Sequence, residues 1–264
     1  MAFHFYCRLV LILLILPCYE DGLNNLADSL FCFYYKVIFM HDWRDIIKQA
    51  LAKPLPGKVA HELMAPSVRF TGTKEPDRKV ARLSSVLILL YPSSKGLAIP
   101  FIQRPEYAGV HGGQISLPGG KCEPADACYH DTALRETHEE LGVDPDYVTL
   151  LGELSSLYIP NSNYIVYPHV GFLDEEPLFQ PNQFEVKEVF AVPLNVFLEP
   201  INNTLIKNIN GHRLEAPYFD VEGRQIWGAT AMIMSEFAVA LTNHASDWVS
   251  EVRSCNARSA QESP

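Results

Sequence analysis

A glycine turn followed by an acidic helix, between Leu117 and Val143, constrains this chain more than any other segment. It reads LPGGKCEPADACYHDTALRETHEELGV. Residues three and four apart on a helix share a face, so Glu136, Glu139 and Glu140 are expected to point the same way and to repel one another. A hard cation such as Mg²⁺ relieves that repulsion by taking oxygen ligands, and it usually completes its shell with water and substrate phosphates. The helix therefore indicates a metal platform for a phosphate ester or anhydride.

The opposite face of the same helix is apolar. Leu134, Thr137 and Leu141 recur at helical spacing and are expected to face a core. Gly142 is expected to end the helix, since glycine tolerates the left-handed conformation common there. An ordinary solvated acidic helix is the alternative, but the Pro-Gly-Gly turn at a fixed distance upstream argues against it.

The motif carries a family resemblance. The segment resembles the signature box of the Nudix hydrolases, which cleave nucleoside diphosphates linked to another moiety. In that box, Gly is followed by five residues, Glu, seven residues and then Arg-Glu-x-x-Glu-Glu-x-Gly. Here Asp126 takes the acidic position, and Arg135 follows after eight residues. Both departures resemble the coenzyme A pyrophosphatase branch, whose Pro-Gly-Gly-Lys-x-Asp/Glu-Pro-x-Asp run is matched between Pro118 and Asp126.

A second fingerprint of the branch lies just upstream. Arg104, His111, Gly113 and Gln114 match it, whereas Gly109 stands where a second Arg is expected. Arg matches phosphate with a planar fork of donors, so its loss bears on coenzyme A specificity and not on the hydrolase chemistry. Taken singly, His111 is expected to be a loop histidine without a role and Arg104 a solvated charge. Only the spacing that they share with the branch fingerprint favours a role in substrate binding.

The resemblance implies a mechanism in outline. One or more Mg²⁺ or Mn²⁺ ions bridge the diphosphate and the acidic helix, and activated water attacks one phosphorus. A small-molecule nucleotide is the expected substrate. Arg135 and Glu139, one turn apart, are expected to pair. By resemblance, the metal ligands are Glu136, Glu139, Glu140 and Gly120, the catalytic residues are Glu136, Glu139, Arg135 and Glu185, and the substrate-binding residues are Arg104, His111, Gln114 and Lys121.

Composition excludes some classes of protein. With 264 residues, of which 48% are hydrophobic and 20% charged, the chain is typical of a globular protein. Its net charge of -10 argues against nucleic-acid binding, which needs a basic surface. The six cysteines form no Cys-x-x-Cys pair and the nine histidines no His-x-x-x-His pattern, which argues against zinc. A reduced, cytoplasmic protein is the simplest interpretation. A homodimer stays among the expected assemblies.

The amino-terminal stretch differs from the rest. Residues 1–39 are an atypical apolar extension, and its Leu9–Leu16 run is too short for a membrane span and lacks a good signal-peptide cleavage region. Met40 precedes an amphipathic helical pattern that includes Trp43 to Leu51. Our hypothesis is that Met40 is the true start, and the rival is a genuine anchor or export signal. No membrane segment is expected for the core domain at 40–246, and residues 247–264 are expected to be a polar, frayed tail.

The remaining pattern alternates strands and helices. Strands are expected at residues 85–90, 97–103, 148–154, 165–172 and 189–194, and Asn210-Gly211 indicates a hairpin between 204–209 and 213–219. A last long helix is expected from residue 226 to about 242. Periodicity alone gives α/β or α+β. The family resemblance implies a Nudix-type α/β/α sandwich with a mixed β-sheet.

Three functions remain open. The first is a divalent-metal pyrophosphohydrolase that cleaves coenzyme A or its derivatives to 3′,5′-ADP and phosphopantetheine. The second is the same chemistry on another nucleoside diphosphate derivative, such as ADP-ribose or a dinucleotide, and Gly109 keeps it open. The third is a Nudix-like domain that only senses a nucleotide. Such sensors can lose the helix carboxylates, and all three are present here.

Overall fold

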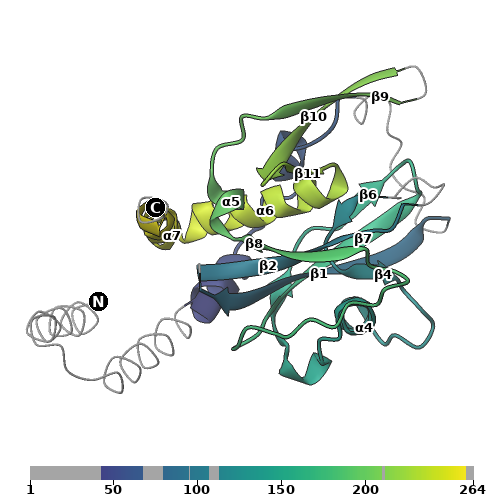
Figure 1. Cartoon of the computed structure of the whole chain (residues 1–264), viewed down its shortest axis with the longest axis horizontal. Helices are drawn as coiled ribbons and strands as arrows, with labels where there is room; N and C mark the ends of the chain where they lie inside the picture. The colour runs from purple at the N-terminus through teal and green to yellow at the C-terminus, as the bar shows by residue number, and fades with distance from the viewer. Residues whose placement is uncertain (1–42, 68–79, 95, 107–112, 210–211, 260–264) are drawn as a thin grey trace, which may run out of the picture. The chain divides into compact units, whose positions relative to one another are not determined.

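A mixed sheet forms the centre of the part of the chain that the computed structural model describes, residues 43–67, 80–94, 96–106, 113–209 and 212–259 (Figure 1). Within these residues the sheet has eight strands. Strands β1 (Arg82–Ser93) and β7 (Tyr164–Phe172) lie side by side and run parallel, while the other pairings are antiparallel. The other strands of this sheet are β2 (Gly96–Gln103), β3 (Ile115–Ser116), β4 (Gly119–Lys121), β5 (Thr149–Glu153), β6 (Leu157–Ile159) and β8 (Glu188–Pro193).

Helices cover both faces of this sheet. Helix α4 (Tyr129–Leu141) lies on one face and α6 (Ala229–His244) on the other (Figure 1). The predicted run of apolar residues at 85–90 is buried in β1 on both sides except for the half-buried Val86, as a strand between two helical layers should be. Ala133 and Leu141 of α4 pack on the sheet in one core cluster, and Leu134 is partly buried against it. The α/β/α sandwich with a mixed sheet is therefore confirmed.

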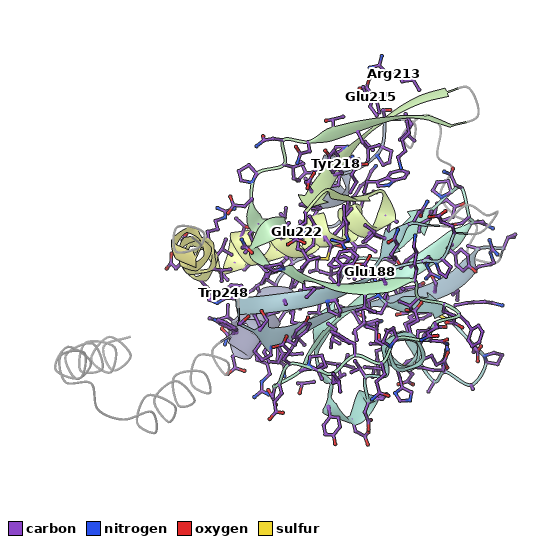
Figure 2. All side chains as sticks on the ribbon, viewed as in Figure 1. Glu188, Arg213, Glu215, Tyr218, Glu222 and Trp248 are labelled. Atoms are coloured by element: carbon purple, nitrogen blue, oxygen red, sulfur yellow. The ribbon has the colours of Figure 1, made fainter. Side chains whose placement is uncertain are left out.

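A second, three-stranded sheet follows in the chain. It consists of β9 (Thr204–Ile209), β10 (His212–Val221) and β11 (Arg224–Trp227), all antiparallel. The predicted hairpin is confirmed by the β9–β10 register, although Asn210-Gly211 lies outside the described residues. An ion pair of 2.6 Å between Arg224 and Glu188 links β11 to β8 of the central sheet. Glu188 is labelled in Figure 2. The final helix begins three residues later than expected because Ile226 and Trp227 belong to β11.

Three shorter helical segments and one predicted helix complete this part of the chain. The amphipathic pattern from Trp43 to Leu51 is confirmed as a helix at residues 43–51. Helix α3 (Lys58–Leu63) and the 3-10 turn η1 (Pro145–Tyr147) were not expected, and the short helix α5 (Asn195–Leu198) directly follows the β8 strand. In the α3–α6 contact, the buried carboxylate of Glu236 lies 2.8 Å from His61 Nε2 and accepts hydrogen bonds from the backbone N–H groups of Gly57 and Ser155.

The expectation of a frayed carboxyl-terminal tail is wrong for most of its length. Residues 246–259 form helix α7 (Ser246–Ser259), which packs against α5 and α6. Its Trp248 and Val249 are buried, and Trp248 is labelled in Figure 2. A pair of adjacent apolar residues in a polar segment was too short a pattern to predict a docked helix.

The expected extension at residues 1–39 and the candidate start at Met40 lie outside the described residues. Across the described ranges, no helix combines the length and the apolar character needed to cross a membrane.

Candidate active site at the acidic helix

The glycine turn before α4 approaches the rest of the site unusually closely. Strand β4 pairs with β1, where a Cβ atom on Gly119 would lie 2.3 Å from the carbonyl oxygen of Ser85. A Cβ atom on Gly120 would lie 2.3 Å from the carboxyl carbon of Glu136. Glycine is required at Gly119, where the atoms met are backbone, whereas a Cβ on Gly120 would force the Glu136 carboxylate to move. The turn therefore brings a backbone directly against a carboxylate of α4.

Arg135 organises the outer side of α4. Its guanidinium donates to both oxygens of Asp126, at 2.9 and 3.1 Å, and to the carbonyl of Lys121 at 3.0 Å. It also pairs with Glu136 at 3.0 Å and with Glu139 at 3.3 Å, so the expected Arg135–Glu139 pair is confirmed. The hydrogen bond from Arg135 holds the pKa of Asp126 well below its usual range, and the acidic partners raise the pKa of Arg135. This arrangement fixes the orientation of two helix carboxylates.

Glu140 points into the protein rather than into solvent. Its side chain is only 2% exposed and accepts a 2.8 Å hydrogen bond from the backbone N–H of Gly119. Burial raises its pKa to about 7, against the lowering effect of Arg104 and of the Gly119 hydrogen bond. The expected division of the helix into an acidic face and a buried apolar face thus needs correction, because Glu140 is buried, Glu136 is half-buried and Glu139 is exposed.

Negative charge is crowded around this pair of inner carboxylates. Burial raises the pKa of Glu136, and the charges of Glu139 and Glu185 raise it further, although Arg135 opposes them. The charges of Glu136 and Glu185 also raise the pKa of Glu140. A cation placed among these groups would relieve the repulsion.

A loop after β7 brings Glu185 to the site. Backbone N–H groups of Gln180 and Asn182 donate to the carbonyls of Leu141 and Glu140, at 2.8 and 3.0 Å. These bonds satisfy carbonyls that the end of a helix leaves without partners. The loop can come so close because Gly142 ends α4 with a φ of 73°, and a Cβ there would lie 2.8 Å from Gln180. The predicted role of Gly142 as helix terminator is confirmed.

These elements surround one pocket with a volume of about 360 Å³. Arg104, which directly follows β2, also lines it, with Nη2 3.2 Å from the Gly119 carbonyl and 3.7 Å from Glu140. One cation and three carboxylates therefore face a common space. The pocket is lined by Arg104, Pro105, Gly119, Gly120, Glu136, Glu140, Phe184 and Glu185.

The donor set of this pocket fits a hard divalent ion. Carboxylate oxygens and backbone carbonyls are the ligands that Mg²⁺ and Mn²⁺ prefer. Glu136 and Glu140 line the pocket with pKa values raised by burial first and by neighbouring carboxylates second, and such an ion would stabilise their charged forms. Gly120 also lines the pocket, whereas Glu139, which pairs with Arg135 on the same helix, is not among the described lining residues. The metal-binding role predicted for these four residues stays a prediction.

The predicted substrate-binding residues differ in whether they line the pocket. Arg104 lines the pocket, whereas Gln114 and Lys121 are not among its described lining residues. The backbone carbonyls of Gln114 and Lys121 instead accept hydrogen bonds from Arg104 N and Arg135 Nη2. His111 lies outside the described residues.

Sequence reasoning missed Phe184, whose ring is 93% exposed although it lines the pocket. A single aromatic residue in a polar loop carries no periodic pattern. Sequence reasoning placed Asp126 at the acidic position of the family motif. It did not predict that Asp126 pairs with Arg135, nine residues later.

The chain is similar to known Nudix proteins. The NUDIX domain family matches residues 81–210. The chain is 33% identical over 153 residues to the uncharacterized Nudix hydrolase NudL of Yersinia enterocolitica, covering 53% of this chain and 77% of that protein. It is 42% identical over 137 residues to the human mitochondrial coenzyme A diphosphatase NUDT8, covering 50% of this chain. It is 41% identical over 116 residues to the mouse peroxisomal coenzyme A diphosphatase NUDT7, covering 44% of this chain.

The chain belongs to the Nudix hydrolase family. It spans 57% of the length of NUDT8 and 49% of the length of NUDT7, so the substrates of those two proteins do not transfer by similarity alone. Their names place them in two organelles, and the cytoplasmic location expected from the cysteines stays a prediction.

Proposed function

We propose that this chain is a divalent-metal-dependent pyrophosphohydrolase that cleaves the diphosphate of coenzyme A or its derivatives to 3′,5′-ADP and phosphopantetheine. The observation that carries the proposal is the pocket where Arg104 faces Glu136, Glu140 and Glu185 across the glycine turn. A pocket with both a cation and a carboxylate cluster suits a diphosphate, whose charge needs a donor on one side and a bound ion on the other.

Each residue has a distinct task in this proposal. Glu136, Glu139 and Glu140, with the backbone of Gly120, would hold Mg²⁺ or Mn²⁺. The bound ion supplies a more acidic water and stabilises charge on the leaving oxygen. Arg104 donates hydrogen bonds to a phosphate oxygen, and its contact with the Gly119 carbonyl aims it across the pocket.

The remaining groups orient the helix carboxylates and take the proton from the attacking water. Arg135 keeps Glu136 and Glu139 in fixed positions through ion pairs of 3.0 and 3.3 Å. Glu185 lines the same pocket from the loop, and in this proposal it would accept the proton of the attacking water. Because Gly120 lies so close to Glu136, no side chain fits between the turn and the helix. A substrate would therefore contact the backbone of the turn at this side of the pocket.

Coenzyme A is favoured as substrate by two features. The run from Pro118 to Asp126 matches the coenzyme A pyrophosphatase branch, and two of the relatives are coenzyme A diphosphatases by name. One observation favours a second candidate, another nucleoside diphosphate derivative such as ADP-ribose. Gly109 replaces the second Arg of the branch fingerprint and removes a phosphate donor.

The test is a substrate panel with the full chain, Mg²⁺ or Mn²⁺, coenzyme A and ADP-ribose, with products identified by mass spectrometry. Glu136→Gln and Glu140→Gln should each lower turnover about 100-fold or more, because each removes a charge that acts on the transition state. Glu175→Gln, an exposed carboxylate outside the pocket, should not.

Preferred splitting of coenzyme A, lost in the two pocket variants, supports the proposal. A preference for ADP-ribose keeps the chemistry and replaces the substrate. Absence of turnover, with nucleotide binding retained, overturns the enzyme and favours a sensor.

A further inference from the structure

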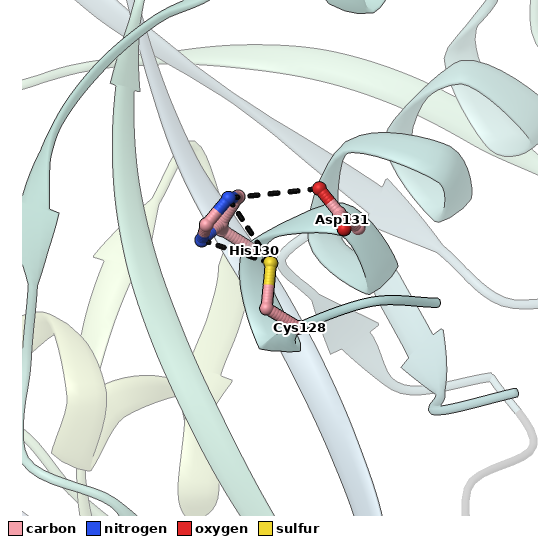
Figure 3. Close-up of side chains that lie close together, drawn as sticks. All are labelled: Cys128, His130 and Asp131. Atoms are coloured by element: carbon pink, nitrogen blue, oxygen red, sulfur yellow. Dashed lines mark hydrogen bonds and ion pairs between the residues drawn. The ribbon is translucent and has the colours of Figure 1, made fainter. Parts of the chain in front are cut away.

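A second group of metal-ligand side chains lies at the opposite end of α4 from the catalytic carboxylates. Cys128 Sγ, a nitrogen of His130 and a carboxylate oxygen of Asp131 all lie within 4.8 Å of one another (Figure 3). His130 Nε2 is central, at 3.1 Å from Cys128 Sγ and 3.6 Å from Asp131 Oδ1. It is the one group with this proximity found among the described residues.

The cysteine at the start of α4 is an unusual capping residue. Cys128 is the N-cap of α4, a position where Ser, Thr, Asp or Asn normally accepts a hydrogen bond from the first turn. Its side chain makes no capping bond, and Sγ turns to the imidazole of His130 instead. The loop is also held in place, since Asp126, two residues earlier, is fixed by Arg135 and by the hydroxyl of Thr132.

An unpaired buried imidazole lies beside this group. His169, on β7, is 6% exposed, and its Nε2 has no hydrogen-bond partner among the described residues. Its ring lies edge-on to that of His130, with the centroids 6.0 Å apart. A buried polar atom without a partner is unfavourable, so an imidazole nitrogen left in this state beside His130 points to a ligand.

The distances suit one tetrahedral ion. Zinc binds Cys sulfur at about 2.3 Å and His nitrogen or Asp oxygen at about 2.0 Å, so two ligand atoms on one ion lie about 3.3–3.6 Å apart. The separations of 3.1 and 3.6 Å at His130 Nε2 are close to these values. Cys128 Sγ also lies 3.3 Å from Nδ1, so the sulfur sits across the ring, and the ring must turn to direct one nitrogen at an ion shared with Sγ. A thiolate with an imidazole selects zinc-like ions, in contrast to the all-oxygen set of the pocket.

We propose that Cys128, His130 and Asp131 form a binding site for a thiophilic divalent ion such as Zn²⁺, distinct from the acidic pocket. A water molecule or the imidazole of His169 completes the tetrahedron. Binding releases the thiol proton of Cys128 to solvent, and it joins the start of α4 to β7 if His169 takes part. Asp131 and Glu136 are five residues apart, about 7.5 Å along the helix axis, so the two sites can be filled independently.

This proposal departs from the expectation against zinc, which rested on the lack of Cys-x-x-Cys and His-x-x-x-His pairs. The sequence places the three side chains in Cys-x-His-Asp order, a spacing that a helix start can bring together and that neither pattern covers.

Cobalt titration of the reduced full chain tests the site, because Co²⁺ bound to a thiolate gives a sulfur-to-metal charge-transfer band that oxygen ligands do not give. The titration is made on Glu136→Gln protein, so that the acidic pocket competes less for the ion. Cys128→Ser is the test variant, and Cys122→Ser is the matched control, since Cys122 is a second free, partly buried thiol six residues away. His130→Asn removes the central ligand from an exposed position.

The expected result is a band that saturates at one added equivalent and persists in Cys122→Ser. Cys128→Ser should abolish that equivalent, His130→Asn should weaken its affinity at least tenfold, and circular dichroism should show both variants folded. Absence of a band in the parent protein, full retention of it in Cys128→Ser, or an equal loss in Cys122→Ser would each overturn the proposal.

Discussion

Arg135 and Asp126 face each other as a bidentate ion pair, with Nε donating to Oδ1 at 2.9 Å and Nη2 to Oδ2 at 3.1 Å. The same guanidinium reaches Glu136 and Glu139. Asp126 also accepts a hydrogen bond from Thr132 Oγ1, which ties the loop to the first turn of α4. The acid that departs from the common family motif therefore positions the arginine, and the arginine positions the carboxylates.

Replacing Asp126 by Asn should damage both stability and activity. The variant loses the charge that opposes Arg135, and a hydrogen bond to a charged group contributes about 2 kcal/mol, so the free energy of unfolding should fall by about that amount. Turnover should fall about 10–100-fold, as for other groups that orient metal ligands. Urea denaturation and steady-state kinetics measure the two effects.

A double-mutant cycle with Arg135→Gln is the control. If Asp126 acts through Arg135, the second substitution should add little to the first, because the two side chains share one interaction. Fully additive losses would show that Asp126 acts independently of Arg135.

Replacing Gly120 by Ala should remove metal-dependent activity, since the new Cβ would meet the Glu136 carboxyl carbon at 2.3 Å. The carboxylate must move from its position beside the turn, and metal affinity should weaken at least tenfold. Calorimetry with Mg²⁺ or Mn²⁺ checks the affinity.

A second substitution that removes the clash should restore the lost stability. Gly120→Ala should destabilise the fold, and adding Glu136→Ala should restore most of the lost stability because it removes the atoms that the Cβ meets. Without that rescue, strain in the turn itself would explain the loss.

Periodicity and turn signals were enough to predict much of this fold. The β1 and β7 strands are apolar runs buried on both faces, and the β9–β10 hairpin follows a two-residue turn signal. Helix α7 was missed because only Trp248 and Val249 mark its docked side. Its helical state depends on packing against α5 and α6, which local patterns do not encode.

The candidate site was predictable only in part. The helix carboxylates and Arg104 follow from one contiguous motif and its upstream neighbour. Spacing on an ideal helix could not predict that Glu140 turns inward to the Gly119 N–H, because that depends on the approach of β4 to the helix. The exposed ring of Phe184 reaches the pocket through a loop that caps α4, a relationship between segments about forty residues apart.

The raised pKa of Glu140 predicts how the stability of the metal-free protein depends on pH. Its pKa is about 7 in the folded state and near the ordinary value of 4.5 in the unfolded chain. Between these values the folded state binds more protons, so the free energy of unfolding should fall as pH rises through this window, by about 3 kcal/mol in total.

Denaturation at several pH values, without metal, measures that decline. Glu140→Gln should show a correspondingly smaller decline, because its side chain does not titrate, and added Mg²⁺ should reduce the decline in the parent protein. The same slope in parent and variant would mean that other groups dominate this window.

Phe184 offers the pocket a flat apolar surface that contributes little to the fold. Its ring is 93% exposed, and an aromatic ring stacks on a nucleic base with about 1–3 kcal/mol. Phe184→Ala should therefore raise KM for a nucleotide substrate about tenfold, with kcat and the thermal midpoint nearly unchanged. Leu178→Ala is the matched control, since Leu178 is 86% exposed in the same connection and does not line the pocket. If kcat falls while KM stays constant, Phe184 acts in the chemical step and the ring does not bind the base in the ground state.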